Sequence, residues 1–537
     1  MPKFTLNGQE IEAKPGQTII QAAEDHGVEI PHYCYHPDLP IDGNCRMCLV
    51  DVEKMPKLTP ACTTLVNEGM VVRSENERVK QAVRGVLEFL LINHPVDCPV
   101  CDQAGECRLQ DYYMVYGLHT SEIPLGMKVR KRKVIDLGPM VVLDQERCVL
   151  CSRCIRFFDH VTETGEMQFF GRGDHVAIGT FEDRPLDNPY SGNVVDICPV
   201  GALTSRDFRF KCRVWFLHAT DSICGGCSTG CAVRIDHRDG AIFRMIPRRN
   251  PEVNRSWLCD EGRLSFHELN KTERISRPLM KGRDGVQAPV TWEEAVRSID
   301  ARLKEIREAN GAGSILGFAS PSATNEALFL FKRYLGDQLG ATQFDFRVDS
   351  EDKNVLEEED QVLRHFDKHP NSTGAIKLGL MSKELGGING AIAAARAGQI
   401  KAGVVIYFPP LVRRPCDEEV EGRVFELIDV LEYSVVLAAH KSEWQTAASV
   451  VLPVTAWSEE EGTYTNFEGR VQFAGKAIDA GGDALAVWEA FAMLLHASGA
   501  EAPWMSAEDV FATLTEHVPA YSEVTLDKTR LPGVVVG

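Results

Sequence analysis

The sequence lacks any run of apolar residues long enough to cross a bilayer as a helix, which takes about 18 to 20 of them. It also lacks an excess of basic side chains, because 77 Asp and Glu residues outnumber 58 Lys and Arg, for a net charge of −19. Binding to nucleic acid depends on Lys and Arg, so no nucleic-acid partner is expected. No low-complexity tract occurs, and 44% hydrophobic and 25% charged residues are typical of a globular protein.

The start of the chain lacks the apolar core of a signal peptide and a twin arginine. We therefore expect a protein without a direct membrane span, either cytosolic or docked on the cytosolic side of a larger complex. At 537 residues the chain is too long for one ordinary core, so several domains are expected.

Cysteine, by contrast, is abundant. The odd total of 17 and the tight C-x2-C pairs favour metal ligands over disulfides in a reducing compartment. All but two cysteines fall into four groups. Cys212 and Cys416 lie outside them, and we expect both to be small buried hydrophobic residues.

The first group lies in an expected β-grasp, ferredoxin-like fold. Residues 4–13 alternate in polarity around Asn7-Gly8, which predicts a hairpin, and Thr18 is placed to cap a helix that runs to Gly27. The spacing C-x10-C-x2-C-x13-C offers the four thiolates of a [2Fe-2S] centre. Zinc remains an alternative for any four cysteines. The predicted ligands are Cys34, Cys45, Cys48 and Cys62.

The second group follows a predicted helix. Ser74 and Glu77 have the spacing of a capping box, an apolar face extends from Val79 to Leu91, and Pro95 ends the helix. A histidine at a helix end is usually structural, but this one begins the pattern H-x3-C-x2-C-x5-C, which favours a ligand role. The predicted ligands are His94, Cys98, Cys101 and Cys107.

Two further groups have spacings suited to cubane clusters. C-x2-C-x2-C followed by a remote Cys-Pro is the pattern that bacterial ferredoxins use for [4Fe-4S] clusters, and it suits tetrahedral zinc poorly. The last group has the spacing C-x2-C-x3-C-x27-C, with glycines that let backbone N–H groups approach the sulfurs. The predicted ligands are Cys148, Cys151, Cys154 and Cys198 for the third group and Cys224, Cys227, Cys231 and Cys259 for the fourth.

From about residue 273 the pattern becomes α/β. Thr291 and Glu294 form a capping box before an apolar helix face. Buried strands are predicted at residues 314–319, 402–407, 433–439 and 449–454, and helices at 325–335 and 388–397. Such alternation predicts a parallel sheet with helical crossovers. Residues 340–385 receive no assignment, and no phosphate loop or G-x-G-x-x-G motif stands out.

These motifs in this order resemble the large iron–sulfur subunit of bacterial respiratory complex I, the NuoG type of NADH:quinone oxidoreductase. The resemblance is closest at residues 93–107, NHPVDCPVCDQAGEC, which looks like that family's His(Cys)3 signature. It implies one [2Fe-2S] and three [4Fe-4S] clusters, in the ligand sets given above, with the fourth set off the main electron path. The implied domains are a 2Fe-2S ferredoxin-type domain (1–77), a His(Cys)3 4Fe-4S domain (78–137), a 4Fe-4S ferredoxin-like domain (138–215), a 4Fe-4S Mo/W bis-MGD-type domain (216–272) and a shortened molybdopterin-oxidoreductase-like α/β domain (273–537).

The C-terminal part resembles a molybdopterin-oxidoreductase domain, most clearly at residues 462–470, GTYTNFEGR. It departs from working molybdoenzymes in its shorter length and in having no cysteine between Cys259 and Cys416. A lysine that follows the fourth cluster cysteine in many catalytic relatives is also missing, since residues 260–263 read DEGR. The resemblance therefore implies a scaffold without molybdopterin.

By this resemblance the chain relays electrons without bond chemistry of its own. Electrons would come from an FMN- and NADH-binding subunit with its small [2Fe-2S] partner and leave to [4Fe-4S] connecting and quinone-module subunits, at the cytoplasmic side of the cell membrane. One alternative is an electron-transfer subunit of a cytosolic NAD-linked hydrogenase or formate dehydrogenase. A second is a zinc-stabilised assembly scaffold with no redox role, which colour and iron content would distinguish.

Overall fold

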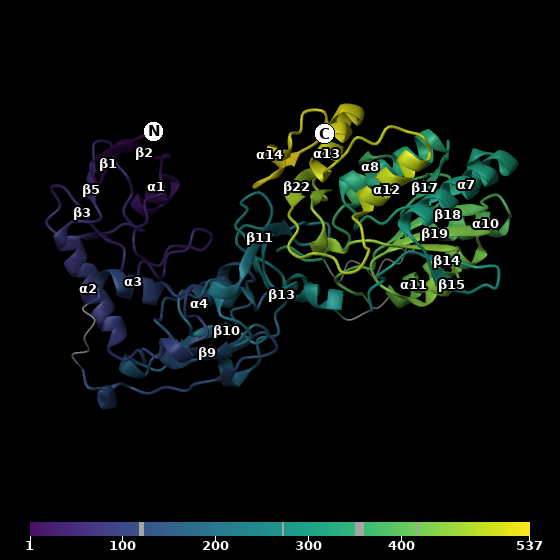
Figure 1. The fold of residues 1–537 in the computed structure, drawn as a ribbon. Coiled ribbons are helices and arrows are strands. Elements are labelled where there is room, and N and C mark those ends of the chain that lie inside the picture. Colours follow the sequence, from purple (N-terminus) through teal and green to yellow (C-terminus); the bar gives the residue numbers. More distant parts are fainter. Residues whose placement is uncertain (118–122, 271–272, 349–358, 415–416) are drawn as a thin grey trace. The chain divides into compact units, whose positions relative to one another are not determined.

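The structure is a computed structural model that describes residues 1–117, 123–270, 273–348, 359–414 and 417–537. The chain divides into two compact units, residues 1–217 and residues 218–537, and Figure 1 labels many of the elements in each.

The N-terminal unit begins with a five-stranded mixed sheet ordered β2-β1-β5-β3-β4. The predicted hairpin is present, and Asn7 and Gly8 at its turn have φ values of 51° and 89°, as a type I′ turn requires. Helix α1 packs on the sheet, and its start is fixed where the Thr18 N–H donates to Gln21 Oε1 at 2.9 Å. The elements are β1 (Lys3–Leu6), β2 (Gln9–Glu12), α1 (Ile19–Asp25), β3 (Leu49–Val52), β4 (Thr59–Pro60) and β5 (Val71–Arg73).

Helix α2 (Glu77–Leu91) begins at a different cap from the predicted one. Asn76 is the N-cap, because its Oδ1 accepts a hydrogen bond from the Val79 N–H at 2.9 Å. The predicted Ser74–Glu77 box is wrong, since Ser74 exchanges two 2.8 Å hydrogen bonds with the side chain of Asn7 instead. Ser74 is therefore bonded to the hairpin turn of the sheet, and Asn76, two residues later, caps the helix.

The remainder of the N-terminal unit is built from short elements around the cysteine groups. Helix α2 packs against α3 (Arg108–Tyr116). A three-stranded antiparallel sheet, β10-β7-β6, supports the third group. The elements are β6 (Ile135–Asp136), β7 (Val141–Leu143), α4 (Arg153–His160), β8 (Met167–Phe170), β9 (Ala177–Thr180), α5 (Asn193–Asp196) and β10 (Leu203–Ser205).

The C-terminal unit starts with an antiparallel sheet, β11-β12-β13, that carries the fourth cysteine group at one end. Its strands are β11 (His218–Ile223), β12 (Ala232–Arg238) and β13 (Ala241–Pro247), followed by helix α6 (Asp260–Leu264). A seven-stranded sheet ordered β15-β14-β20-β19-β18-β16-β17 follows, and its strands from β16 to β20 pair in parallel. The predicted parallel sheet is therefore confirmed.

The strands and helices of this large sheet lie close to their predicted positions. Helix α7 begins at the predicted capping box, where Glu294 N–H donates to Thr291 Oγ1 at 3.2 Å and Thr291 N–H donates to Glu294 Oε2 at 3.0 Å. The strands are β14 (Leu279–Lys281), β15 (Gln287–Pro289), β16 (Ile315–Phe318), β17 (Gln343–Asp345), β18 (Ala402–Tyr407), β19 (Tyr433–Ala438) and β20 (Val450–Pro453). The helices are α7 (Trp292–Asn310), α8 (Asn325–Lys332), α9 (Ser372–Lys377), α10 (Gly387–Arg396) and α11 (Asp417–Val430).

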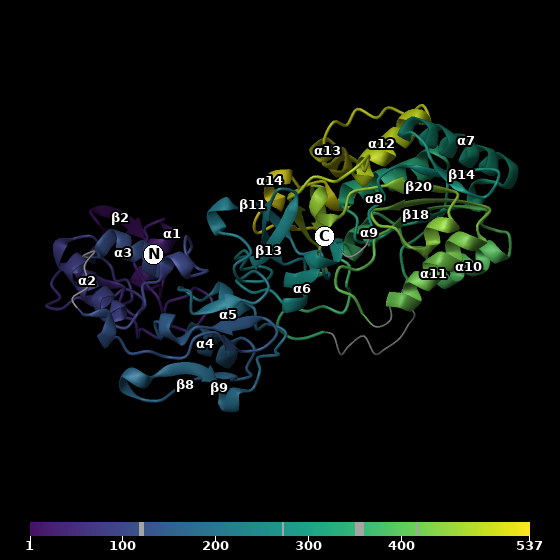
Figure 2. The same cartoon turned by 60° about the horizontal axis from the view of Figure 1, so that its bottom comes forward.

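Helices cover both faces of the sheet (Figures 1 and 2). Along β19, Val435 and Leu437 face a core shared with α7, α8, α12 (Val487–Ala497) and α13 (Ala507–His517). Val436 and Ala438 of the same strand face a second core shared with α10 and α11. A strand buried on both sides reads as a continuous apolar run, which is why these strands were predictable from sequence.

The motif at residues 462–470 forms a separate small sheet beside helix α8. Strand β21 (Gly462–Thr465) pairs with β22 (Arg470–Ala474), which pairs with β23 (Val534–Val535) near helix α14 (Leu526–Thr529). Glu326 of α8 is fully buried, and its carboxylate accepts hydrogen bonds from the N–H and hydroxyl of Thr463 at 2.9 to 3.1 Å. This carboxyl group therefore links the small sheet to helix α8, which packs on the large sheet.

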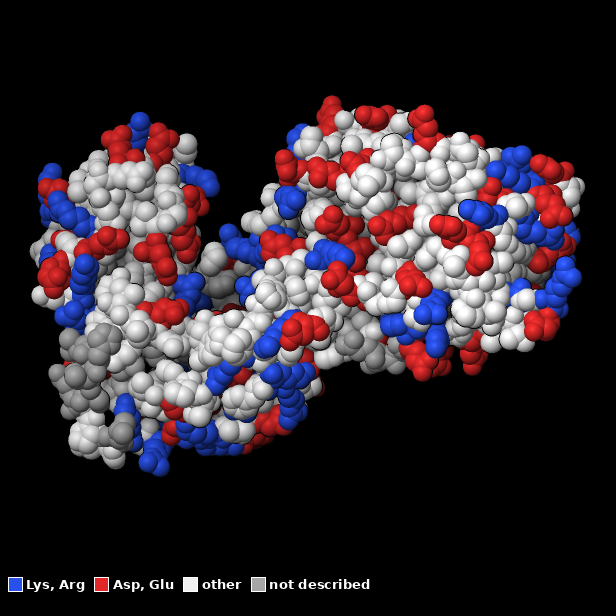
Figure 3. All heavy atoms as spheres, viewed as in Figure 1, with Lys and Arg blue, Asp and Glu red and all other residues white. Residues whose placement is uncertain are grey.

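The surface carries charges of both signs. On the face shown in Figure 3, acidic side chains alternate with basic ones over the C-terminal unit rather than forming one field of either sign. Among the described residues, no helix combines the length and the apolar character needed to cross a membrane.

A Glu326→Gln substitution should make the stability of the C-terminal unit less dependent on pH. Burial raises the pKa of Glu326 from an ordinary 4.5 to about 7, so the folded unit holds a proton there that the unfolded chain has released. The resulting stabilisation is fully present below about pH 4.5 and is lost as the pH rises through about 7. The substitution should flatten the slope by up to about 1.4 kcal/mol per pH unit in this window.

Hydrogen exchange at the Thr463 amide between pH 5 and pH 8, corrected for intrinsic exchange, measures this slope. The exposed Glu516→Gln in α13 is the matched control and should leave it unchanged. An equal slope in wild type and Glu326→Gln would show that Glu326 stays ionised in the folded chain.

Candidate metal centres

The first cysteine group closes into a compact set of sulfurs. Cys34, Cys48 and Cys62 are buried, and Cys45 is half-buried. Hydrogen bonds from the thiols of Cys45 and Cys62 hold the pKa of Cys34 far below its usual range, and a hydrogen bond from the Cys62 thiol lowers the pKa of Cys48. The Cys34 N–H also donates to Cys45 Sγ at 3.5 Å. The four sulfurs predicted from the C-x10-C-x2-C-x13-C spacing therefore meet.

His94 lies just past the end of helix α2, as the sequence predicts. The ammonium group of Lys128 donates to the carbonyls of Leu91 and His94 at 2.8 and 2.6 Å, which ties the end of the helix to the start of the loop. Burial lowers the pKa of His94 to about 4. The ring is therefore neutral at pH 7, the form in which imidazole binds a metal.

The three cysteines after His94 face the same interior. Burial raises the pKa of Cys107 to about 11, and the Cys101 and Cys98 thiols add to this effect. Asp97 and Arg147 act electrostatically on both the His94 ring and the Cys101 thiol, which places ring and thiol in one pocket.

A glycine from the third group closes this pocket. A Cβ on Gly201 would lie 2.3 Å from Cys101 Sγ, far inside van der Waals contact. The Arg108 N–H donates to the Pro199 carbonyl at 3.1 Å, and Arg147 pairs with Asp97 at 2.7 Å. The loop that follows Cys198 thus forms a wall of the His94 site. Sequence reasoning missed Gly201, Asp97, Arg147 and Lys128, because their roles depend on contacts far apart in the chain.

The third group is held by a tight turn. Leu150 and Ser152 have positive φ values of 54° and 61°, a conformation that residues other than glycine seldom adopt. The turn directs Cys148, Cys151 and Cys154 to one side, where Cys148, Cys151 and Cys198 all act electrostatically on the Cys154 thiol. The Leu150 N–H donates to Cys148 Sγ at 3.4 Å.

The fourth group gathers at one end of the sheet β11-β12-β13. Cys224 follows β11, Cys231 precedes β12, and Cys259 is the N-cap of α6, with its Sγ accepting from the Gly262 N–H at 3.3 Å. A Cβ on Gly262 would lie 3.0 Å from Cys224 Sγ and 3.1 Å from Cys259 Sγ, so the glycine lets both sulfurs approach. The Gly226 N–H donates to Cys224 Sγ at 3.4 Å.

Burial raises the pKa of all four thiols in the third group and of Cys224, Cys231 and Cys259 in the fourth, to about 12 for Cys198 and Cys224. A buried thiolate is unfavourable unless a positive charge or a metal compensates it. These donor sets fit iron–sulfur clusters, whose iron atoms supply that compensation and whose sulfurs accept backbone N–H hydrogen bonds.

Within the described residues, no three His, Cys, Asp or Glu side chains are placed to hold one metal ion together. The ligands of a cluster are shared among two or four iron atoms, so they stand farther apart than those of a single ion. All sixteen described cysteines are free thiols, and Cys416 lies outside the described residues. Cys212 is half-buried rather than buried, so its prediction is wrong; its Sγ lies 3.5 Å from the Arg213 carbonyl oxygen.

The three groups of the N-terminal unit share one interior. A single hydrophobic cluster contains Cys34, Cys107 and Cys151, one buried cysteine from each group. The ring of Tyr33 lies in the same cluster, 5.5 Å from the ring of Tyr112, and both Cys45 and Cys107 act electrostatically on it. Chain order is therefore not spatial order, because the second and third groups both approach the first.

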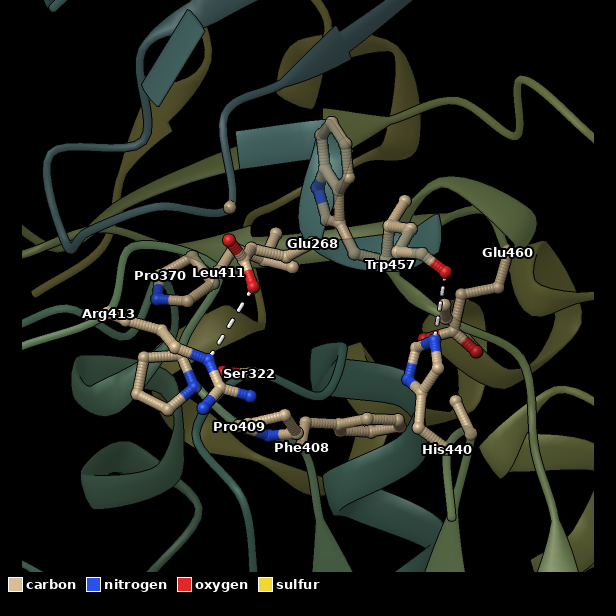
Figure 4. A pocket seen from close by; sticks show the side chains of 15 residues that line it. Glu268, Ser322, Pro370, Phe408, Pro409, Leu411, Arg413, His440, Trp457 and Glu460 are labelled. Carbon is tan, nitrogen blue, oxygen red and sulfur yellow. Dashed lines mark hydrogen bonds and ion pairs between the residues drawn. The ribbon is translucent and has the colours of Figure 1, made fainter. Parts of the chain in front are cut away.

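A pocket of about 640 Å³, part of it open to solvent, lies at the carboxyl ends of β18, β19 and β20 in the C-terminal unit. Figure 4 shows Phe408 and Trp457 on its walls, Arg413 paired with Glu268, and His440 beside Glu460. Parallel sheets of this kind bind ligands at such a position, so this is where a molybdopterin would be sought.

The lining of this pocket does not fit a phosphate-bearing pterin. Arg413 is already paired with Glu268 at 3.5 Å, and burial lowers the pKa of His440, which leaves its ring neutral. Glu460 adds a second carboxyl group, whose pKa burial raises to about 7. The other described residues that line the pocket are uncharged, and none of them is a cysteine. Among these residues a phosphate would therefore meet two carboxyl groups and no unpaired cation.

A Gly201→Ala substitution should disrupt the His94 site alone. The added methyl group would displace Cys101 Sγ, so about four irons per chain should be lost while the other sites keep theirs. Gly85→Ala in α2 is the matched control, because a Cβ there meets no atom within 4 Å. Iron content after anaerobic purification measures the effect, and equal iron in both variants would rule out the predicted displacement.

Family models match each cysteine group separately. "2Fe-2S iron-sulfur cluster binding domain" matches residues 2–77, and "NADH-ubiquinone oxidoreductase-G iron-sulfur binding region" matches 84–122. "NADH-quinone oxidoreductase subunit 3, ferredoxin-like domain" matches 138–204, and "NADH-ubiquinone oxidoreductase NDSU1/NuoG-like, 4Fe-4S domain" matches 217–267. "Molybdopterin oxidoreductase" matches 274–365 and 356–497. The chain thus contains 2Fe-2S and 4Fe-4S binding domains followed by an α/β domain of the molybdopterin type.

Curated relatives agree with these matches. The G-type subunit of NADH-quinone oxidoreductase from Rickettsia bellii is 41% identical over 354 residues, covering 65% of this chain and 51% of the relative. The NADH-ubiquinone oxidoreductase 75 kDa subunit of Reclinomonas americana is 40% identical over 375 residues, covering 69% of this chain and 53% of the relative. A solved NAD+-reducing [NiFe]-hydrogenase chain matches with a TM-score of 0.36 and 28% identity, over 40% of this chain and 91% of that one.

The chain spans about half the length of the curated relatives it matches. Each of its four cysteine groups lies inside one family-model match. The predicted resemblance is therefore confirmed: the chain is similar, through all four groups, to the G-type iron–sulfur subunit of NADH-quinone oxidoreductase.

Proposed function

We propose that this chain is an iron–sulfur electron-transfer subunit in the peripheral arm of an NADH:quinone oxidoreductase. The observation that carries the proposal is the shared interior of the N-terminal unit, where one buried cysteine from each of three groups joins one hydrophobic cluster. Electron transfer between clusters requires close approach through packed protein, and this interior provides it. The similarity to the Rickettsia bellii subunit supports the same function.

In this proposal sixteen side chains hold four clusters. A [2Fe-2S] cluster is bound by Cys34, Cys45, Cys48 and Cys62. Three [4Fe-4S] clusters are bound by His94, Cys98, Cys101 and Cys107; by Cys148, Cys151, Cys154 and Cys198; and by Cys224, Cys227, Cys231 and Cys259. The clusters accept and release single electrons, while the protein supplies burial and hydrogen bonds to their sulfurs.

The partners follow from the same proposal. Electrons enter from an FMN- and NADH-binding subunit with its small [2Fe-2S] companion, and leave to [4Fe-4S] connecting subunits of the quinone-reducing module. The chain sits on the cytoplasmic side of the membrane as a peripheral part of the complex. The α/β domain serves as a scaffold without molybdopterin, which the two carboxyl groups and the paired Arg413 in its pocket support.

Anaerobic purification of the chain with iron and sulfide counts and EPR tests the proposal. One two-iron and three four-iron clusters give ~14 irons per chain. A count of ~10 or fewer would mean that at least one of the four clusters is absent. A colourless protein containing zinc would contradict electron transfer and support the structural alternative. Molybdenum in the preparation would contradict the scaffold role of the C-terminal domain.

A His94→Cys substitution should lower the reduction potential of one [4Fe-4S] cluster. An anionic thiolate stabilises the oxidised state more than the neutral imidazole does. Redox titration followed by EPR measures the shift, and the exposed His26→Cys in the N-terminal unit is the control. If every cluster kept its wild-type potential, His94 would not be a ligand.

A further inference from the structure

Two arginines at the start of helix α4 are buried between the first and third cysteine groups. Arg153 is 5% exposed and Arg156 is 8% exposed. Arg153 lies between the ligand candidates Cys151 and Cys154 in the chain, and Arg156 lies about one turn farther along the helix. Guanidinium groups keep their positive charge even when buried, so this interior holds two fixed charges.

Both arginines donate to uncharged oxygens within the part of the chain that the structure describes. Arg153 donates to the carbonyls of Ile197, at 3.0 Å, and of Tyr35, and its Nε is buried without a hydrogen-bond partner. Both carbonyls belong to residues that adjoin ligand candidates, Cys198 and Cys34. Arg153 thus spans from the third group to the first.

Arg156 makes a similar bridge. Its guanidinium donates to the carbonyls of Cys34 and Pro40 on one side and of Cys151, at 3.3 Å, on the other, while its Nε donates to Ser152 Oγ at 3.0 Å. The hydroxyl of Ser152 in turn donates to the exposed carboxylate of Asp42. Among the described residues, the guanidinium itself contacts backbone and hydroxyl oxygens, and no carboxylate.

Buried charges of this kind are costly unless an anion compensates them. Arg147, one residue before the third group, shows the usual solution, since it pairs with the carboxylates of Asp97 and Asp144. For Arg153 and Arg156 the available anions are cysteine thiolates. Burial raises the pKa of Cys151, and the positive charges of Arg153 and Arg156 are among the influences that oppose this rise.

We propose that Arg153 and Arg156 are the built-in counter-charges of the [4Fe-4S] cluster held by Cys148, Cys151, Cys154 and Cys198, and that they raise its reduction potential. This inference rests on the proposed function, because it requires that a cluster occupies the third group. The two residues act by position and charge, and neither binds iron.

The electron balance is simple. Reduction adds one electron to the cluster, which makes the cluster and its thiolates more negative by one charge. The electron comes from the preceding cluster and leaves to the next, and the arginines neither gain nor lose protons. Two fixed positive charges at this short range stabilise the reduced state more than the oxidised state, because the interior screens charges less than water does. The cluster beside them therefore accepts an electron more readily than it would without the two charges.

Anaerobic redox titration of the full chain, followed by EPR, tests the proposal. The signal of the third group is the one that a Cys154→Ser variant loses. At the potential where this wild-type cluster is half reduced, Arg153→Gln and Arg156→Gln should each lower the ratio of reduced to oxidised cluster at least tenfold. That ratio corresponds to a downward shift of about 59 mV for one electron. The potentials of the fourth group should stay unchanged.

Charge and geometry are separated by Arg153→Lys and Arg156→Lys, which keep the charge but lose the planar fork of donors. Both lysine variants should load the cluster and titrate closer to wild type than the glutamine variants do. Arg78→Gln, at a half-exposed arginine paired with Asp51, is the control and should shift nothing.

Three outcomes would overturn the inference. If neither the glutamine nor the lysine variants load the cluster, the arginines serve packing and not charge. The same conclusion would follow if the glutamine variants load the cluster and its reduction potential is unchanged. It would also follow if the lysine variants lower the reduction potential as far as the glutamine variants do. If wild-type protein itself contains no iron and gives no EPR signal, the proposed function fails, and this result is distinct from the other three.

Discussion

The burial of thiol groups is the constraint on which the N-terminal half depends. In the third group, burial raises the pKa of Cys148, Cys154 and Cys198, which then resist becoming thiolates unless a positively charged partner compensates them. In the third group two arginines supply part of that charge, and iron would supply the rest. The surrounding elements are short. Small sheets and single-turn helices, rather than one large core, hold the ligand loops.

The C-terminal unit is organised differently. Its sheet is buried on both faces by helices, and apolar side chains fill the cores between them. The pocket at the carboxyl ends of the strands has the position of a ligand site, but its described lining offers no unpaired cation to a phosphate-bearing cofactor. Packing of the sheet and the lining of this pocket depend on different residues, because the two cores consist of apolar side chains and the charged groups lie at the strand ends.

Sequence spacing predicted what is local. The bounds of β18 and the Thr291–Glu294 capping box of α7 match the structure because each depends on residues a few positions apart. The C-x2-C pair in each of the four cysteine groups was recognisable for the same reason. The cap of α2 was missed because the choice between Ser74 and Asn76 is settled by Asn7, 67 residues away from Ser74. Strand β17 and helix α9, within residues 340–385, had no pattern strong enough to assign. Gly201, Arg153 and Arg156 were missed because their roles arise only where distant loops meet.

The approach of Gly201 to Cys101 also bears on how the chain divides into domains. The residues matched by one family model, 84–122, contain the ligand candidates of the His94 site, but the wall of that site comes from residues matched by another, 138–204. The His94 site therefore needs both segments, because the loop from the second segment closes the pocket beside Cys101. The two segments build one site, although family models describe them as two.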